Sequence, residues 1–151
     1  MEIILENQNG ETIDLSKMKS KKILFFYPKA NTPGWTTETR GFGESYEEFK
    51  KLGIEVVGIS RDTVKKQFNF AKKLETPFNL LSDIDGVVCE AFGVWQEKKF
   101  MGKTYMGIVR STFLLDENNE VIKEWRKVKV KGHVEAVLEA CKEWYLWILI
   151  W

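Results

Sequence analysis

The sequence contains little of what metal sites, disulfide frameworks and membrane spans require. It has two cysteines and one histidine among 151 residues, and Cys89 and Cys141 lie far apart with no C-x-x-C pattern. Neither a structural zinc site nor a disulfide framework is therefore predicted, and we expect no metal or other cofactor. No apolar run reaches the roughly 20 residues that a membrane-spanning helix needs.

A charge excess of either sign is also lacking, since 23 basic side chains are balanced by 22 acidic ones. A nearly neutral chain gives no long-range attraction to nucleic acid, so no nucleic-acid partner is expected. Residues 1–6 lack the basic start and apolar core of a secretion signal. Together with the two isolated cysteines, this predicts a cytoplasmic protein. The length suits one domain with its own core.

Short apolar runs alternate with segments of helical periodicity, the pattern of an α/β domain. Continuous apolar runs predict buried strands at 23–27, 54–59 and 78–81. The segments 112–115 and 121–125 predict a hairpin, whose turn contains Asn119 because asparagine tolerates positive φ.

Helices are predicted between these strands and after them. The first covers about 35–52, the second starts from an Asp62 cap, a short one covers 87–92, and the last starts near His133. The expected buried stripe of the second helix is Val64, Phe68, Ala71 and Leu74, and that of the last is Val134, Val137, Leu138 and Cys141. The segment 96–107, rich in lysine and glycine, is predicted to be a loop.

Residues 27–42 read Y-P-K-A-N-T-P-G-W-T-T-E-T-R-G-F. They resemble the active-site segment of the peroxiredoxin Q family, also called bacterioferritin comigratory proteins, where the pattern is Y-P-K-D-N-T-P-G-C-T-x-E-x-C-x-F. Further segments resemble the family in the same order, namely 57–62, 78–83, 92–95, 102–108 and 110–116. The resemblance covers about residues 1–143 and implies a thioredoxin-like α/β fold of peroxiredoxin type, with a central mixed sheet flanked by helices.

In that family the first cysteine attacks peroxide and the second, in many members, resolves the sulfenic acid. The resemblance places Trp35 and Arg40 at these two positions, while the supporting residues match at Pro28, Thr32, Pro33, Gly34 and Arg110. Because an indole nitrogen only donates a hydrogen bond, Trp35 cannot attack an O–O bond. We therefore expect a scaffold that is inactive as a thiol peroxidase. Ala30 also departs from the family pattern, and the clustered changes suggest an engineered variant.

An enzyme is the alternative hypothesis. It would act as a thiol peroxidase through Cys89 or Cys141, as a Cys/His hydrolase, or with a redesigned activity. The helical pattern places both cysteines as small buried residues. His133 lies two turns from Cys141 in one predicted helix and cannot reach it, whereas a pairing of His133 with Cys89 stays open. In a third interpretation, a bulky Trp35 keeps the first helix locally unfolded.

A basic run begins in the second hairpin strand and continues beyond it. It contains Lys123, Arg126, Lys127, Lys129 and Lys131 in alternation with apolar residues. We interpret it as a half-buried strand with a solvated basic face, with an anion or nucleic-acid site as the less favoured alternative.

Residues 144–151, W-Y-L-W-I-L-I-W, form an apolar C-terminal extension beyond the peroxiredoxin-like domain 1–143 and hold three of the six tryptophans. A helix that is apolar on all faces must be buried by something. We expect a homo-oligomer or a protein partner to bind Trp144, Trp147, Ile148 and Trp151. The alternatives are a tail folded onto its own domain beside Trp35 and, less favoured, a membrane-surface contact.

Overall fold

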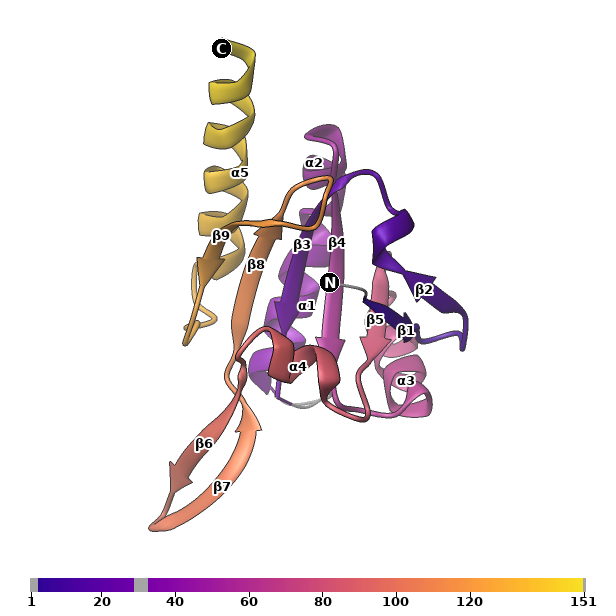
Figure 1. Cartoon of the computed structure of the whole chain (residues 1–151), viewed down its shortest axis with the longest axis vertical. Coiled ribbons are helices and arrows are strands. Elements are labelled where there is room, and N and C mark those ends of the chain that lie inside the picture. Colours follow the sequence, from indigo (N-terminus) through magenta and orange to yellow (C-terminus); the bar gives the residue numbers. More distant parts are fainter. Residues whose placement is uncertain (1–2, 29–32, 151) are drawn as a thin grey trace.

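A computed structural model describes residues 3–28 and 33–150, with the side chains of 33–35 and 146–150 outside this description. Seven strands form one sheet in the order β2-β1-β5-β4-β3-β8-β9 (Figure 1). They are β1 (Ile4–Glu6), β2 (Thr12–Asp14), β3 (Lys21–Phe26), β4 (Ile54–Ser60), β5 (Asn79–Ser82), β8 (Ser111–Leu115) and β9 (Val121–Trp125). A separate hairpin consists of β6 (Trp95–Phe100) and β7 (Lys103–Ile108).

The helices are α1 (Pro33–Glu44), α2 (Tyr46–Lys51), α3 (Val64–Leu74), α4 (Val87–Ala91) and α5 (His133–Ile150), with a short 3₁₀ turn at Leu15–Lys17. Strands β3, β4 and β5 are mutually parallel, and β8 pairs antiparallel with β3. The sheet is therefore mixed, as predicted. The three parallel strands are the continuous apolar runs of the sequence, because helices and loops cover both of their faces.

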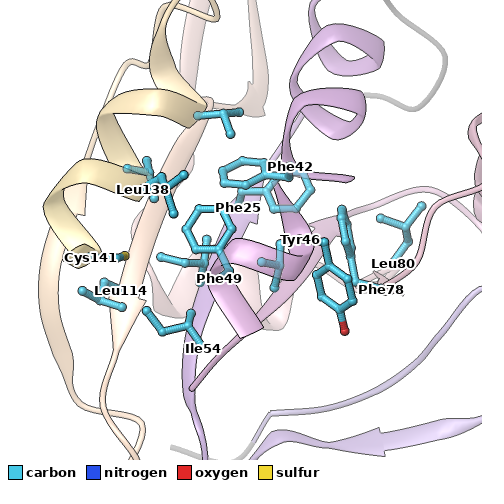
Figure 2. Packing of buried hydrophobic residues seen from close by; sticks show 14 of the residues in the cluster. Phe25, Phe42, Tyr46, Phe49, Ile54, Phe78, Leu80, Leu114, Leu138 and Cys141 are labelled. Carbon is cyan, nitrogen blue, oxygen red and sulfur yellow. The ribbon is translucent and has the colours of Figure 1, made fainter. Parts of the chain in front are cut away.

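The two faces of the sheet bury two separate aromatic clusters. Side chains alternate along β3, so Phe25 points to the face with α1, α2 and α5, while Phe26 points to the face with α4. Phe25 stacks on Phe42 with ring centroids 4.6 Å apart, and Figure 2 shows the cluster around this pair. On the other face Phe26 meets Phe113 edge-on at 5.6 Å.

The predicted helix 35–52 is two helices that separate at Ser45. Gly41 and Gly43 weaken helix propensity just before the break. Gly41 also permits close packing on α5, because a Cβ at this position would lie 3.0 Å from a methyl group of Val134. Phe42 of α1 and Tyr46 and Phe49 of α2 all lie in the core despite the break.

Two details predicted for α3 are wrong. Thr63, not Asp62, caps the helix, since its hydroxyl accepts a hydrogen bond from the Lys66 amide at 3.2 Å. Phe68 is 44% exposed and Phe70 is 2% exposed, so Phe70 belongs to the buried face. That face also contains Gln67, and this buried polar residue hid the apolar stripe in the sequence.

The predicted loop 96–107 is the β6–β7 hairpin, which extends away from the main sheet in Figure 1. Its turn holds Met101 and Gly102, both at positive φ (50° and 77°), as a tight hairpin turn requires. Most hairpin side chains are exposed and many are charged. No apolar alternation therefore marked these strands in the sequence.

The basic run was also interpreted wrongly as one strand. β9 ends at Trp125, and Lys127 has φ 51° within an irregular segment that leads to α5. The hairpin turn before β9 is as predicted, with Asn119 at φ 63°. Strands β1 and β2, which have three residues each, were not anticipated.

Helix α5 begins at His133 and buries Val134, Val137, Leu138 and Cys141, as predicted. Its backbone stays helical to Ile150 and continues past the end of the sheet (Figure 1). Within residues 3–28 and 33–150, none of the helices combines the length and apolarity that a membrane crossing requires.

The corrected face of α3 can be tested with a matched pair of variants. Phe70→Ala should lower the free energy of unfolding by about 3–5 kcal/mol, because it leaves a cavity in the core. Phe68→Ala, two residues away and half exposed, should cost no more than about 1 kcal/mol. Urea unfolding of both variants measures the difference, and equal losses would contradict the assignment.

Candidate functional site

The segment that resembles an active site connects the end of β3 to the start of α1. Tyr27 and Pro28 follow β3 directly, and the backbone of residue 35 lies in the first turn of α1. Thr32 and Ala30 lie outside the described residues, as does the Trp35 side chain. Because α1 is helical from Pro33, the interpretation of a locally unfolded first helix is wrong for this structure.

The predicted supporting residue Arg110 binds a carboxylate that the sequence analysis did not single out. Arg110 lies between β7 and β8, and its Nη1 donates to Glu38 Oε2 at 2.9 Å. Glu38 is fully buried on α1, one turn after residue 35, and Arg110 is 16% exposed. The ion pair therefore joins the first turns of α1 to the start of β8, and it places a guanidinium beside the helix that carries residue 35.

Burial raises the pKa of Glu38 to about 7, although the hydrogen bond and charge of Arg110 act in the opposite direction. Glu38 Oε1 has no hydrogen-bond partner among the described residues. The effect of desolvation on the pKa therefore outweighs that of a single ion pair, because one of the two carboxylate oxygens accepts no hydrogen bond from the described residues. The carboxyl group holds its proton to near neutral pH.

Arg40, at the second family cysteine position, lies on the solvent side of α1. Its side chain is exposed, whereas its neighbours Glu38 and Thr39 are buried. The ion pair of Arg110 goes to Glu38. The structure thus does not bring Arg40 into the Glu38–Arg110 pair.

A second buried polar network lies below the same segment. The Tyr27 hydroxyl donates to Gln67 Oε1 at 2.5 Å, and Gln67 Nε2 donates to Ser60 Oγ at 2.9 Å. Ser60 Oγ in turn donates to Asp62 Oδ2 at 2.7 Å. Burial raises the pKa of Tyr27 well above its usual value, so its hydroxyl stays protonated. The network connects the ends of β3 and β4 to α3 and fixes Tyr27 before Pro28.

Both cysteines are free and fully buried, on opposite faces of the sheet. Burial and a hydrogen bond to Asp83 raise the pKa of Cys89 far above its usual value. Burial raises the pKa of Cys141 to about 12. Neither thiol is therefore ionised to a useful extent at neutral pH.

His133 does not pair with either cysteine in a dyad. Its Nε2 lies 2.8 Å from Thr112 Oγ1, and its ring meets Phe42 and Trp125 edge-on. These neighbours lie on the sheet face opposite Cys89, so the predicted alternative of a Cys89–His133 pair is wrong. Burial lowers the pKa of His133 to about 4. Among the described residues, no group of His, Cys, Asp and Glu could hold a metal ion.

The described part of the tail is remote from the first turn of α1. Trp144 is half buried and, with Leu114 and Ile122, lines a hollow of about 360 Å³. Figure 1 shows the C-terminal end of α5 at the end of the molecule away from the start of α1. The helix therefore does not carry the tail toward Trp35. The side chains of Trp147 and Ile148, and all of Trp151, lie outside the described residues.

Comparisons with known proteins agree over nearly the whole chain. The AhpC/TSA family model matches residues 1–124. Peroxiredoxin Bcp of Bacillus subtilis is 49% identical over 140 residues, which are 92% of this chain and 89% of that protein. Peroxiredoxin Bcp of Escherichia coli K12 is 44% identical over 140 residues, 92% of this chain and 90% of that protein.

Solved structures give the same result. The bacterioferritin comigratory protein of Xanthomonas campestris, studied for alkyl peroxide reduction, has a TM-score of 0.90 at 43% identity, covering 95% of this chain and 92% of that one. Peroxidoxin BcpB of Mycobacterium tuberculosis has a TM-score of 0.84 at 33% identity, covering 95% and 93%. These matches confirm the predicted thioredoxin-like fold of peroxiredoxin type.

The raised pKa of Glu38 makes stability depend on pH. A carboxyl group with a pKa of about 7 in the folded chain and an ordinary value of 4.5 binds more protons when folded. Its stabilising contribution is complete below the ordinary value and is lost as the pH rises through 7. As the pH rises from about 4.5 to 8, the unsubstituted chain should therefore lose roughly 3 kcal/mol of unfolding free energy relative to Glu38→Gln.

Urea unfolding at several pH values measures this difference. The lowered pKa of His133 makes stability rise with pH, which is opposite to the effect of Glu38. This contribution is present in both proteins and cancels in their difference. Glu48→Gln, an exposed position on α2, is the matched control and should run parallel to the unsubstituted chain. A Glu38→Gln difference that is constant with pH would contradict the assignment.

Proposed function

We propose that this chain, which belongs to the AhpC/TSA family in its Bcp/peroxiredoxin Q group, keeps the fold and the supporting groups of a thiol peroxidase. It lacks the thiolate that performs the reaction. In the reaction of such enzymes, a thiolate attacks one peroxide oxygen, the O–O bond breaks, and a sulfenic acid and water or an alcohol form. Residue 35 of this chain is tryptophan. It offers no atom for that attack.

One observation carries the proposal: both remaining thiols are buried in separate cores. Cys89 and Cys141 are 0% exposed, on opposite faces of the sheet, and burial is the first cause of the raised pKa of each. Peroxide reduction needs an accessible, ionised sulfur. Neither cysteine meets these two conditions in the folded chain.

The frame itself retains groups that suit the family reaction. The Arg110 guanidinium is fixed by Glu38 at 2.9 Å, and residue 35 lies in the first turn of α1, where backbone amides and the helix dipole favour negative charge. A thiolate at residue 35 would be stabilised by both. That the changes at 35 and 40 were engineered stays an interpretation of the sequence.

Restoring the thiol tests the proposal. The unsubstituted chain should not consume hydrogen peroxide catalytically with dithiothreitol as reductant. Trp35→Cys should turn over at a rate at least roughly 100-fold above that of Trp35→Ser, the scale on which positioned charges accelerate a reaction. Trp35→Ser is the matched control, because it removes the indole without adding a thiol.

A second candidate function is thiol peroxidase activity through Cys89 or Cys141, which the peroxiredoxin names of the relatives favour. It requires an opening of the fold that exposes a thiol. Catalytic peroxide consumption by the unsubstituted chain that disappears in Cys89→Ala or Cys141→Ala would establish it and overturn the first proposal.

We also propose that the end of α5 mediates self-association. The sequence from 146 to 150 is entirely apolar, and the helix runs past the sheet. An apolar segment at a helix end favours burial against another chain. A membrane surface is the less favoured partner, because the eight residues 144–151 are too few to span a bilayer.

Truncation after Tyr145 tests the self-association. This variant keeps Trp144 in its hollow beside Leu114 and Ile122, so the domain should stay folded. Sedimentation velocity should show the full chain as an oligomer that dissociates on dilution, and the truncated chain as a monomer. A full chain that is monomeric at every concentration would contradict the proposal.

A further inference from the structure

The β6–β7 hairpin ends in an apolar tip. Phe100, the last residue of β6, is 65% exposed, and Met101, which follows it in the turn, is 86% exposed. Met101 and Gly102 make the two-residue turn between the strands. The hairpin extends away from the main sheet in Figure 1. Two large apolar side chains at the end of a projecting hairpin favour burial against something outside the chain.

The register of the hairpin places lysines beside this tip. Phe100 lies directly opposite Lys103, and Lys98 lies directly opposite Tyr105. Directly opposite residues of an antiparallel pair point to the same face, and so do residues two apart on one strand. The four side chains therefore share one face of the hairpin, where aromatic rings alternate with ammonium groups. Phe100, Lys103 and Tyr105 are exposed.

The hairpin carries a local positive charge, although the whole chain is nearly neutral. Residues 95–108 contain three lysines and one acidic residue, Glu97. Glu97 lies opposite Met106, and so points to the other face from Phe100 and Lys103. Lys99 and Lys103 make no ion pair among the described residues. The apolar tip is thus flanked by cations that the chain itself does not neutralise.

A lipid surface fits this arrangement better than a protein partner does. A stable protein interface buries about 800 Å² on each partner, and the tip of a single hairpin offers a small apolar surface. A bilayer surface needs only a few apolar side chains at the boundary between headgroups and acyl chains, with basic side chains beside them. Lysine stems lie along apolar surface while their ammonium groups stay among charged headgroups. The lysines specify anionic lipid.

We propose that the tip of the β6–β7 hairpin attaches this chain to membrane surfaces that contain anionic lipid. Phe100 and Met101 enter the boundary between headgroups and acyl chains, while Lys99 and Lys103 pair with lipid phosphate groups. Figure 1 places the hairpin and the C-terminal end of α5 at opposite ends of the molecule, so this contact is separate from the proposed self-association. It uses no atom of residue 35 and does not depend on the proposed loss of thiol peroxidase activity.

Co-sedimentation of the full chain with lipid vesicles tests the apolar part of the contact. The chain should bind vesicles of equal parts phosphatidylglycerol and phosphatidylcholine. Phe100→Ser should weaken this binding at least about tenfold, because it removes an apolar side chain that enters the bilayer. Val87→Ser is the matched control and should bind as the unsubstituted chain does, because Val87 is 66% exposed but lies on α4.

Two double variants separate the local charge of the hairpin from the total charge of the chain. Lys99→Gln together with Lys103→Gln should weaken binding to the same vesicles at least about tenfold. Lys129→Gln together with Lys131→Gln removes the same charge from exposed positions before α5, and should leave the binding unchanged. Vesicles of phosphatidylcholine alone should bind the unsubstituted chain at least about tenfold more weakly than the anionic vesicles.

Nuclear magnetic resonance locates the contact in the unsubstituted chain. With small bicelles of the anionic composition that carry a spin-labelled lipid, the amide resonances of Met101 and Gly102 should broaden. The resonance of Asn118, in the exposed turn between β8 and β9, should not.

Absence of binding to the anionic vesicles would overturn the proposal. Equal binding to phosphatidylcholine alone would also overturn it, because it would indicate apolar adsorption without charge recognition. Equal losses in Phe100→Ser and Val87→Ser, or in the two lysine pairs, would show that the hairpin tip is not the contact.

Discussion

The buried ion pair between Glu38 and Arg110 is the interaction on which the site depends. It joins α1, which carries residue 35, to the start of β8 in the central sheet. Burying a carboxylate with one partner is costly, as the raised pKa of Glu38 indicates. Such a pair does little for stability at neutral pH. Its effect is geometric, since it holds a cation against Glu38 on α1, one turn after residue 35.

Much of the fold could be predicted from the sequence, because its central strands are covered on both faces. The apolar runs that became β3, β4 and β5 are unambiguous. The prediction failed where burial and polarity disagree. Gln67 is polar and buried, and Phe68 is apolar and half exposed, so the face of α3 was misassigned. The β6–β7 hairpin was predicted to be a loop, because its exposed, charged strands carry no apolar alternation.

Only some residues of the candidate site could likewise be predicted from the sequence. Arg110 and the segment around residue 35 could be predicted from their resemblance to a family pattern. The roles of Glu38 and Gln67 could not, because the burial of a polar side chain is decided by tertiary contacts with distant residues. Glu38 matches the one glutamate of the family pattern, and this match was the signal in the sequence that could have identified it. The burial of both cysteines followed from helical periodicity alone.

We propose that the fold and the supporting groups of a thiol peroxidase persist around a missing nucleophile. The most direct measurement is the pKa of the thiol that Trp35→Cys introduces, followed by the ultraviolet absorbance of the thiolate as the pH is raised. We expect a pKa clearly below the ordinary value of about 8.5, because Arg110 and the N-terminus of α1 favour the thiolate. A pKa at or above about 8.5 would contradict it.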